Sequence, residues 1–489
     1  MSKILLIEPG IETKEKVMRV LASIGTNKVN WKFPPLDLMG IGGILRKNGI
    51  CDFTILDALN LELNLRQTKE QIEKEKPEIV IFTFTVFTIQ NDMKVAAITK
   101  EVSLNIKTFG VNFAAESYPG NILQDFPDLD YLAYHEPEYP ALDLIKANYK
   151  PENVGGIYFR QGGIIRKNPE KILANLDDIG ILAHDKIPVN IYCAPYQKRK
   201  PMSATSFTRG CINMCTHCLS RFLRPRPEAG MNSGPVRLRS PENIREELKL
   251  LQSIGVKELR FFDNELTADM AWAETVFAMM IKEKFDITFS CNVRADTVNE
   301  NLLKKMKRAG CHLISIGVDS ASQAMLDNMK KNLTLQQILD AIKLIRKCNF
   351  RLTTFTTFGH KGESPETMLA TVRLIKKINP DLCSFSFAVP IKGTEFYDFL
   401  LQNNYLDKNA PLEAYDPNLP PVYSYPQISS RQMYALAMYG YRSFYFRLGY
   451  IVRRFLRSYQ RWDDLKYMLF CIQRYIFEPF LQRRRLING

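Results

Sequence analysis

Short apolar runs that end in polar residues or glycine, with helix-like stretches between them, recur along most of this chain of 489 residues. Strands that alternate with helices predict a parallel sheet covered on both faces, with ligands bound at the carboxyl ends of the strands. Two such series are present, so we expect an α/β fold with more than one domain. The first series has strand-like runs at residues 4–7, 53–56, 79–84, 106–111 and 131–134 and helix-like stretches at residues 36–48, 68–76 and 91–104.

The second series follows a basic segment bounded by prolines, which predicts a linker at residues 186–200. Ser240-Pro241 is a typical helix start, and Gly255 is a typical stop for that helix. Each strand of this series is followed by polar residues or glycine, and in parallel α/β barrels the chemistry gathers at that end. The strand-like runs lie at residues 258–262, 287–293, 312–318, 351–358 and 381–389.

Three cysteines lie in a loop rich in arginine, asparagine and threonine just before the second series. Cys211, Cys215 and Cys218 have the spacing C-x3-C-x2-C, whereas the whole chain has only 10 cysteines. Three thiolates from one short loop can hold three irons of a [4Fe–4S] cluster and leave the fourth iron open to a small molecule. A zinc site would normally want a fourth ligand, and His217 is badly placed to supply it. A zinc site and three unrelated cysteines stay as alternatives.

The loop at residues 207–218 resembles the signature of the radical S-adenosylmethionine (SAM) superfamily. The resemblance implies a partial (β/α)6 barrel over residues 201–400, with Cys211, Cys215 and Cys218 as the cluster ligands. It implies that the open iron binds the amino and carboxylate groups of SAM, and that one-electron reduction cleaves the sulfonium to a 5′-deoxyadenosyl radical. His217 and Leu219 would then pack on the adenine.

Polar residues that follow three strands of the second series are candidate contacts to SAM by the same resemblance. Asp263-Asn264-Glu265 stands in place of the family's Gly-Gly-Glu segment, which accepts the methionine amino group. Because the glycines are missing, the contact is expected from Asp263 or Asn264 as an alternative to Glu265. Arg294 and Asp319 fall where cobalamin-dependent members carry polar contacts to SAM, although exposed salt bridges would explain both residues equally well. No residue stands out as a catalytic general base.

Residues 1–185 resemble the Rossmann-like cobalamin-binding domain that precedes many radical SAM barrels. The resemblance rests on Glu8-Pro9-Gly10, the segment at residues 34–40, the strand that leads into Thr85, and the segment at residues 134–138. It implies a cobalamin cofactor near Glu8, Pro9 and Thr85. The chain departs from the pattern in two places: no Asp-x-His-x-x-Gly motif is present, and residues 110–114 replace the usual glycine pair and histidine. The alternative is a domain of this fold that covers the active site and binds no cobalamin.

Residues 401–489 predict a helical region in which aromatic residues lie among arginines. The last fifty-nine residues carry twelve Lys or Arg and three Asp or Glu, a net charge of +9. Three interpretations are open: helices that pack on the barrel with a solvated basic face, contact with an anionic membrane surface, and nucleic-acid binding. The last is the weakest, because no RNA-binding module is recognisable.

Membrane spans, signal peptides and disulfide patterns can indicate where in the cell a protein lies. No run approaches the ~20 apolar residues of a membrane span. The first residues have too short an apolar run for a signal peptide, and the cysteines show no secreted disulfide pattern. We therefore expect a cytoplasmic protein, with peripheral contact at the inner membrane surface as an alternative.

The resemblance implies an enzyme that abstracts hydrogen from an unactivated carbon and methylates it, with methylcobalamin as the methyl donor and a second SAM to remethylate the cobalt. A small-molecule or lipid-like substrate and an external one-electron reductant are the expected partners. One alternative is radical oxidation or cyclisation of a lipid or tetrapyrrole-like substrate without methyl transfer. The other is an iron–sulfur protein that binds without turnover.

Overall fold

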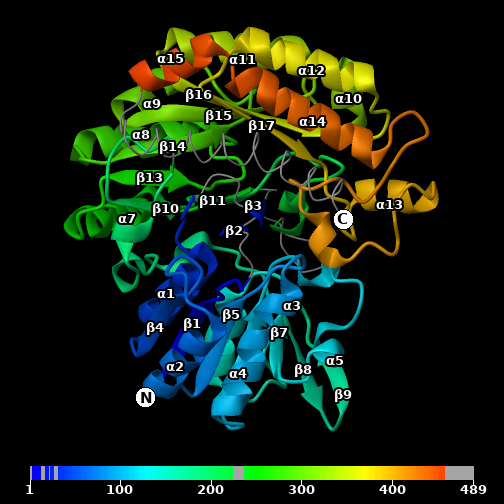
Figure 1. Cartoon of the computed structure of the whole chain (residues 1–489). Helices are drawn as coiled ribbons and strands as arrows, with labels where there is room; N and C mark the ends of the chain where they lie inside the picture. The colour runs from blue at the N-terminus through cyan, green and yellow to red at the C-terminus, as the bar shows by residue number, and fades with distance from the viewer. Residues whose placement is uncertain are drawn as a thin grey trace.

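The computed structural model describes residues 3–12, 17–20, 23–26, 31–194, 196–223 and 236–457, and these residues form two main sheets (Figure 1). The first sheet has seven strands in the order β4-β1-β5-β6-β7-β8-β9, and its first five strands are parallel neighbours. We call the part of the chain that forms it the first domain. Its strands are β1 (Ile4–Glu8), β4 (Phe53–Asp57), β5 (Ile79–Thr83), β6 (Lys107–Val111), β7 (Tyr131–Ala133), β8 (Ile157–Gln161) and β9 (Ile164–Lys167).

Helices cover both faces of the first sheet, because alternate side chains of its strands enter separate apolar clusters. One cluster contains Ile4 and Leu6 with the helices α1 (Leu36–Lys47) and α6 (Glu138–Lys146). The other contains Leu5 and Ile7 with α2 (Leu65–Glu75) and α4 (Lys94–Val102). The helix expected at residues 91–104 is broken, since the short α3 (Ile89–Asp92) ends just before α4 begins.

Two antiparallel hairpins in the first domain were not expected. Strands β8 and β9 extend the sheet beyond β7. Strands β2 (Val17–Val20) and β3 (Ser23–Thr26) form a separate two-stranded ribbon. The ribbon brings Arg19 to the carboxyl edge of the first sheet, where its side chain is buried.

The second sheet is a parallel half-barrel, as the partial (β/α)6 fold predicts. Its strand order is β10-β13-β14-β15-β16-β17, and Figure 1 shows it as an arch above the first domain. Its strands are β10 (Met202–Thr205), β13 (Glu258–Phe261), β14 (Thr288–Val293), β15 (Cys311–Asp319), β16 (Arg351–Phe358) and β17 (Leu382–Phe387). Its helices are α7 (Pro241–Ser253), α8 (Met270–Glu283), α9 (Glu300–Arg308), α10 (Gln323–Asn328), α11 (Leu335–Lys347) and α12 (Pro365–Ile378).

The buried carboxylate of Glu247 on α7 pairs with Arg239 and His184 near the first strand of the half-barrel. The Glu247 Oε2 atom lies 2.6 Å from Arg239 Nη2, and its Oε1 atom lies 3.2 Å from His184 Nε2. All three side chains are almost fully inaccessible. Burial opposes ionisation of Glu247, but Arg239 and His184 outweigh it, so the pKa of this carboxyl lies well below its usual range. The network ties α7 to the chain that enters β10.

The C-terminal helices close the open edge of the half-barrel. The Oη atoms of Tyr441 and Tyr445 on α14 (Ser430–Tyr445) accept hydrogen bonds from the β17 amides of Phe385 (3.0 Å) and Cys383 (2.9 Å). A sheet edge with unpaired amides is a template for association, and these phenols cover it. Tyr441 and Tyr445, which the sequence left open to membrane or nucleic-acid contact, thus pack on the barrel, whereas Phe455 is exposed. Tyr459, Trp462 and Tyr467 lie outside the described residues.

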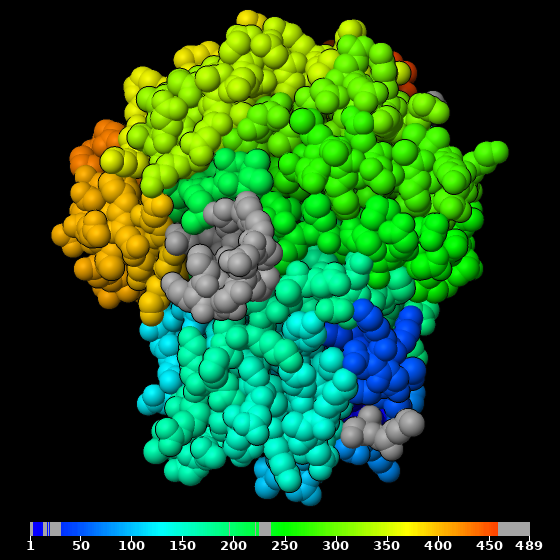
Figure 2. Space-filling model, turned by 180° about the vertical axis from the view of Figure 1, so that it is seen from behind, coloured from blue at the N-terminus to red at the C-terminus, as the bar shows by residue number. Residues whose placement is uncertain are grey.

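The last described helix, α15 (Leu448–Arg457), turns part of its basic side inward. Arg454 is buried, and Arg453 Nη2 donates to Asn379 Oδ1 at 2.8 Å. Leu448, Val452 and Leu456 are exposed on the other side. Among the described helices, none combines the length and the apolar character needed to cross a bilayer. From behind, the half-barrel rests directly on the first domain (Figure 2).

A substitution at Gly359, which follows β16, would test how tightly the C-terminal segment packs on the half-barrel. Its φ is +84°, and a Cβ atom there would lie 2.2 Å from Tyr423 Oη. Gly255 has a similar φ of +82° with open space around it. We expect Gly255→Ala to lower the free energy of unfolding by about 1–2 kcal/mol through backbone strain alone. Gly359→Ala should cost about 1–3 kcal/mol more, because the buried Tyr423 must move. Equal losses in urea denaturation would contradict this packing.

Candidate active site

The carboxyl ends of the two sheets face each other, and a small apolar cluster joins them. Phe113 and Ala114 follow β6 of the first domain, whereas Ile391 follows β17 of the half-barrel. Phe222 and Leu223 follow the cysteine loop and complete the cluster. Ligands held at either edge would therefore lie near the same interface.

The cysteine loop leaves the half-barrel between two short antiparallel strands, β11 (Thr208–Gly210) and β12 (Val236–Leu238). The thiols of Cys211, Cys215 and Cys218 are partly exposed and form no disulfide. The amide of Asn213 lies 3.5 Å from Cys211 Sγ, and the amide of Ser220 lies 3.5 Å from Cys218 Sγ. Burial raises the pKa of Cys215 to about 12 when no metal is bound. Amides directed at sulfur are what a thiolate ligand needs, so the loop fits an iron–sulfur cluster.

Asp263 and Asn264 support this loop from β13. Asp263 Oδ1 accepts hydrogen bonds from the amides of Phe207 (2.8 Å) and Thr208 (2.6 Å), and burial raises its pKa to about 6. Asn264 Nδ2 donates to Ser220 Oγ at 2.9 Å. Ser220 Oγ in turn lies 3.3 Å from Cys218 Sγ. Asp263 thus holds the backbone at the start of the loop, and Asn264 holds a side chain just after it.

Glu265 and Arg294 lie on neighbouring strand ends and both act electrostatically on Cys211. Glu265 Oε1 accepts a hydrogen bond from Thr297 Oγ1 at 3.1 Å, and burial raises the pKa of this carboxyl to about 7. Arg294 Nη2 donates to the carbonyl of Lys331 at 2.5 Å. The structure therefore brings Glu265, Arg294 and the cysteine loop together.

Asp319, at the end of β15, pairs with Lys331, which the sequence did not single out. The Asp319 backbone has a φ of +55°, a left-handed conformation that costs a non-glycine residue on the order of 1 kcal/mol. Met329, two residues before Lys331, accepts the amide of Thr216 at 3.0 Å. This segment therefore braces the cysteine loop from the side of α10.

Two histidines beside the loop present buried nitrogens. The rings of His217 and His360 lie 4.4 Å apart, centre to centre. Among the described residues, neither nitrogen of His360 nor the Nδ1 atom of His217 has a hydrogen-bond partner. Buried polar atoms are rarely left unpaired, so a polar ligand fits at this end of the half-barrel. His360 was missed as a site residue, and its sequence signal is its place in the glycine-containing turn at residues 359–363 that follows β16.

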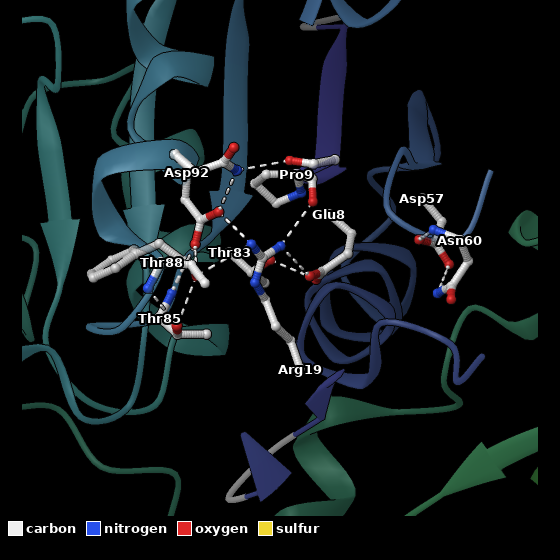
Figure 3. A network of polar contacts seen from close by, with 12 residues as sticks. Glu8, Pro9, Arg19, Asp57, Asn60, Thr83, Thr85, Thr88 and Asp92 are labelled. Carbon is white, nitrogen blue, oxygen red and sulfur yellow. Dashed lines mark hydrogen bonds and ion pairs between the residues drawn. The ribbon is translucent and has the colours of Figure 1, made fainter. Parts of the chain in front are cut away.

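At the carboxyl edge of the first domain, Arg19 gathers the predicted residues (Figure 3). Its Nη1 atom donates to Glu8 Oε1 (3.1 Å) and to the carbonyl of Pro9 (2.8 Å), and its Nη2 atom pairs with Asp92. The Thr85 amide donates to Asp92 Oδ2 at 3.1 Å. Burial raises the pKa of Glu8 to about 7 in spite of Arg19. Glu8, Pro9 and Thr85 thus share one network with Arg19, which the sequence did not indicate.

The side chain of Arg19 is one wall of a small cavity at this edge. The cavity is lined by Glu8, Arg19, Thr85, Asn112 and Phe113 and measures about 20 Å³. Such a volume holds about one water molecule. The hydroxyl and amide groups of the lining suit a ligand rich in amides, but the cavity is far smaller than a corrinoid.

A protein-family model matches the part of the chain that contains the cysteine loop and most of the half-barrel. Residues 205–375 match the model of the radical SAM superfamily. An uncharacterized methyltransferase of Pyrococcus horikoshii is 28% identical over 94% of this chain and 98% of its own length. The anaerobic magnesium-protoporphyrin IX monomethyl ester cyclase of Rubrivivax gelatinosus is 24% identical over 92% of this chain and 80% of its own length.

Solved structures share the whole architecture at low sequence identity. The radical SAM methyltransferase TsrM of Kitasatospora setae, solved with tryptophan and a SAM analogue, superposes with a TM-score of 0.69 at 13% identity and covers 100% of both chains. The cobalamin-dependent SAM radical enzyme OxsB, solved with aqua-cobalamin and SAM, gives a TM-score of 0.63 at 15% identity over 91% of this chain and 61% of its own. These likenesses establish the fold.

Proposed function

We propose that this chain, whose residues 205–375 match the radical SAM model, is a cobalamin-dependent radical SAM enzyme that methylates an unactivated carbon of a small-molecule or lipid-like substrate. The observation that carries the proposal is the position of the three-cysteine loop, which lies at the carboxyl end of the half-barrel and faces the carboxyl edge of the first domain. The match of the family model and the full-length similarity to a methyltransferase support it.

Cys211, Cys215 and Cys218 would hold the [4Fe–4S] cluster. We place SAM between this loop and the strand ends, where Glu265, Arg294 and Asp319 offer polar groups and His217 and His360 offer unpaired nitrogens. Asp263 would act on the loop through the backbone amides that it accepts, and Asn264 through the hydroxyl of Ser220. When bound, the cluster supplies the electron that cleaves SAM, SAM supplies the 5′-deoxyadenosyl group, and cobalamin supplies a methyl carrier.

Cobalamin would lie at the first domain's edge, near Glu8, Pro9 and Thr85. Arg19, which pairs with Glu8 and Asp92, lies at the same position. The chain's own part is to orient the ligands of both edges toward one interface and to exclude water from it. The apolar contact of Phe113, Phe222 and Ile391 supports the second task.

A second candidate function is radical cyclisation or oxidation without methyl transfer. The similarity to the anaerobic cyclase of Rubrivivax gelatinosus, which extends over 92% of this chain, favours it. Both functions need the cluster and SAM, so only the products separate them.

The test is an anaerobic reaction of reconstituted protein with SAM, a chemical reductant and hydroxocobalamin, followed by mass spectrometry. We expect both 5′-deoxyadenosine and S-adenosylhomocysteine, and both should disappear when the three cysteines are replaced. With trideuteromethyl SAM and a metabolite extract, a product should gain one labelled methyl group. Deoxyadenosine without S-adenosylhomocysteine would favour the cyclase alternative. Neither product from a protein with an intact cluster would overturn both functions.

A further inference from the structure

Two arginines lie opposite each other on the hairpin that carries the cysteine loop. Arg209 on β11 is the direct partner of Arg237 on β12. Only Gly210 separates Arg209 from Cys211, the first cysteine of the loop. Like charges directly opposite on two strands destabilise a hairpin. Both side chains are also buried, so this hairpin depends on opposite charges from elsewhere.

Those charges come from the first domain. The carboxylate of Glu136 receives both arginines, with Oε1 at 3.0 Å from Arg209 Nη1 and Oε2 at 2.7 Å from Arg237 Nη1. Glu138 binds Arg209 through both of its oxygens, with Oε2 at 3.1 Å from Nη1 and Oε1 in contact with Nη2. Burial opposes ionisation of Glu136, but Arg237 and Arg209 lower its pKa overall. Two guanidinium groups and two carboxylates thus balance in the interface.

Both glutamates follow β7 and so lie at the carboxyl edge of the first sheet. Glu138 opens α6 and lies against α1, where a Cβ atom on Gly40 would stand 3.0 Å from its Oε1 atom. Asp37 on α1 lines the cavity with Glu8 and Arg19 and lies within electrostatic range of both Glu138 and Arg209. Charged groups therefore lie both at this cavity and around Arg209, two residues before Cys211.

We infer that Arg209 is a positioning residue, through which Glu136 and Glu138 of the first domain set the geometry of the cysteine loop and so of the cluster it holds. The inference rests on the proposed function only in that the three cysteines bind the cluster, and it needs no methyl transfer. A bidentate guanidinium–carboxylate pair fixes direction as well as distance. Groups that orient metal ligands from the outside change metal affinity by about 10–100-fold when they are removed.

Glu138→Gln and Arg209→Lys test this role, because both keep most of the side-chain volume. The measurements are the rate of iron loss to a chelator and the electron paramagnetic resonance spectrum of the reduced cluster with and without SAM. We expect iron loss to accelerate at least about tenfold in each variant, with an altered spectrum. The double variant should lose iron only slightly faster than either single variant, because the two changes break the same interaction.

Glu258→Gln is the matched control. Glu258 is also a buried carboxylate, paired with His312 Nε2 at 2.6 Å, but it begins β13 and so lies at the opposite end of the half-barrel. It should lower the unfolding temperature and leave iron release and the spectrum unchanged. Folded Glu138→Gln and Arg209→Lys proteins with parental iron release and spectrum would overturn the inference. A cluster absent from the parent protein itself would instead count against the proposed function.

Discussion

A variant in which Cys211, Cys215 and Cys218 are all replaced by alanine will hold less than about a tenth of the parent protein's iron and sulfide after anaerobic reconstitution. The three thiols lie on one loop, and Asn213 and Ser220 direct their amides at two of the sulfurs. Without thiolates, the loop loses the three ligands that its C-x3-C-x2-C spacing provides. Production of 5′-deoxyadenosine from SAM should fall to background in the same variant.

Cys348→Ala is the control for this experiment. Cys348 is partly exposed, as the three loop cysteines are, but it caps α11 on the outside of the half-barrel. Its replacement should leave iron, sulfide and SAM cleavage at parental values. If the triple variant holds as much iron and sulfide as the parent, the cysteine loop is not the cluster site and the proposed function fails with it.

Glu247→Ala should lower the free energy of unfolding by about 3–5 kcal/mol, since it leaves Arg239 without its carboxylate and His184 without its buried partner. Urea denaturation followed by tryptophan fluorescence is a direct measurement. Trp272 Nε1 donates to the carbonyl of Arg239 at 2.9 Å, so the indole reports on this network. Glu246→Ala, on the exposed side of the same helix, should change stability by less than about 0.5 kcal/mol.

The effect of Glu247→Ala on the free energy of unfolding should also depend on pH. Its pKa in the folded protein lies well below the ordinary value of 4.5, so its contribution to stability is complete above pH 4.5 and is lost as the pH falls further. Glu247→Ala should therefore differ most from the parent at neutral pH, and the difference should shrink in acid. A constant difference across this range would mean that the charge of Glu247 does not carry the effect.

The sequence predicted the parallel strands well because each is a short apolar run with polar residues at its end. The run at residues 351–358 matches β16 in both bounds, and most of the others differ by one or two residues. The hairpin β8–β9 was missed because β9 is largely exposed and shows no alternation. Its turn, Gly162-Gly163, with positive φ at both residues, was the available signal.

The three cysteines could be proposed as cluster ligands from the sequence because they lie on one loop at a characteristic spacing. Groups that meet only through the fold could not be proposed in this way. Arg19 reaches Asp92 from a separate ribbon, and Arg209 meets Glu138 across the domain interface. Nothing local in the sequence marks such long-range ion pairs. The aromatic residues of α14 were ambiguous for the same reason, because their β17 partners are distant in the chain.

Because the phenols that cover β17 come from α14, the edge of the half-barrel can close only late in synthesis. Ribosomes make β17 before α14, so the strand's Cys383 and Phe385 amides stay bare until Tyr441 and Tyr445 have emerged. During that interval a nascent half-barrel can pair its edge with a neighbouring chain on the same messenger. We therefore expect a sheet that is closed by a helix encoded downstream of it to need protection of its edge during synthesis.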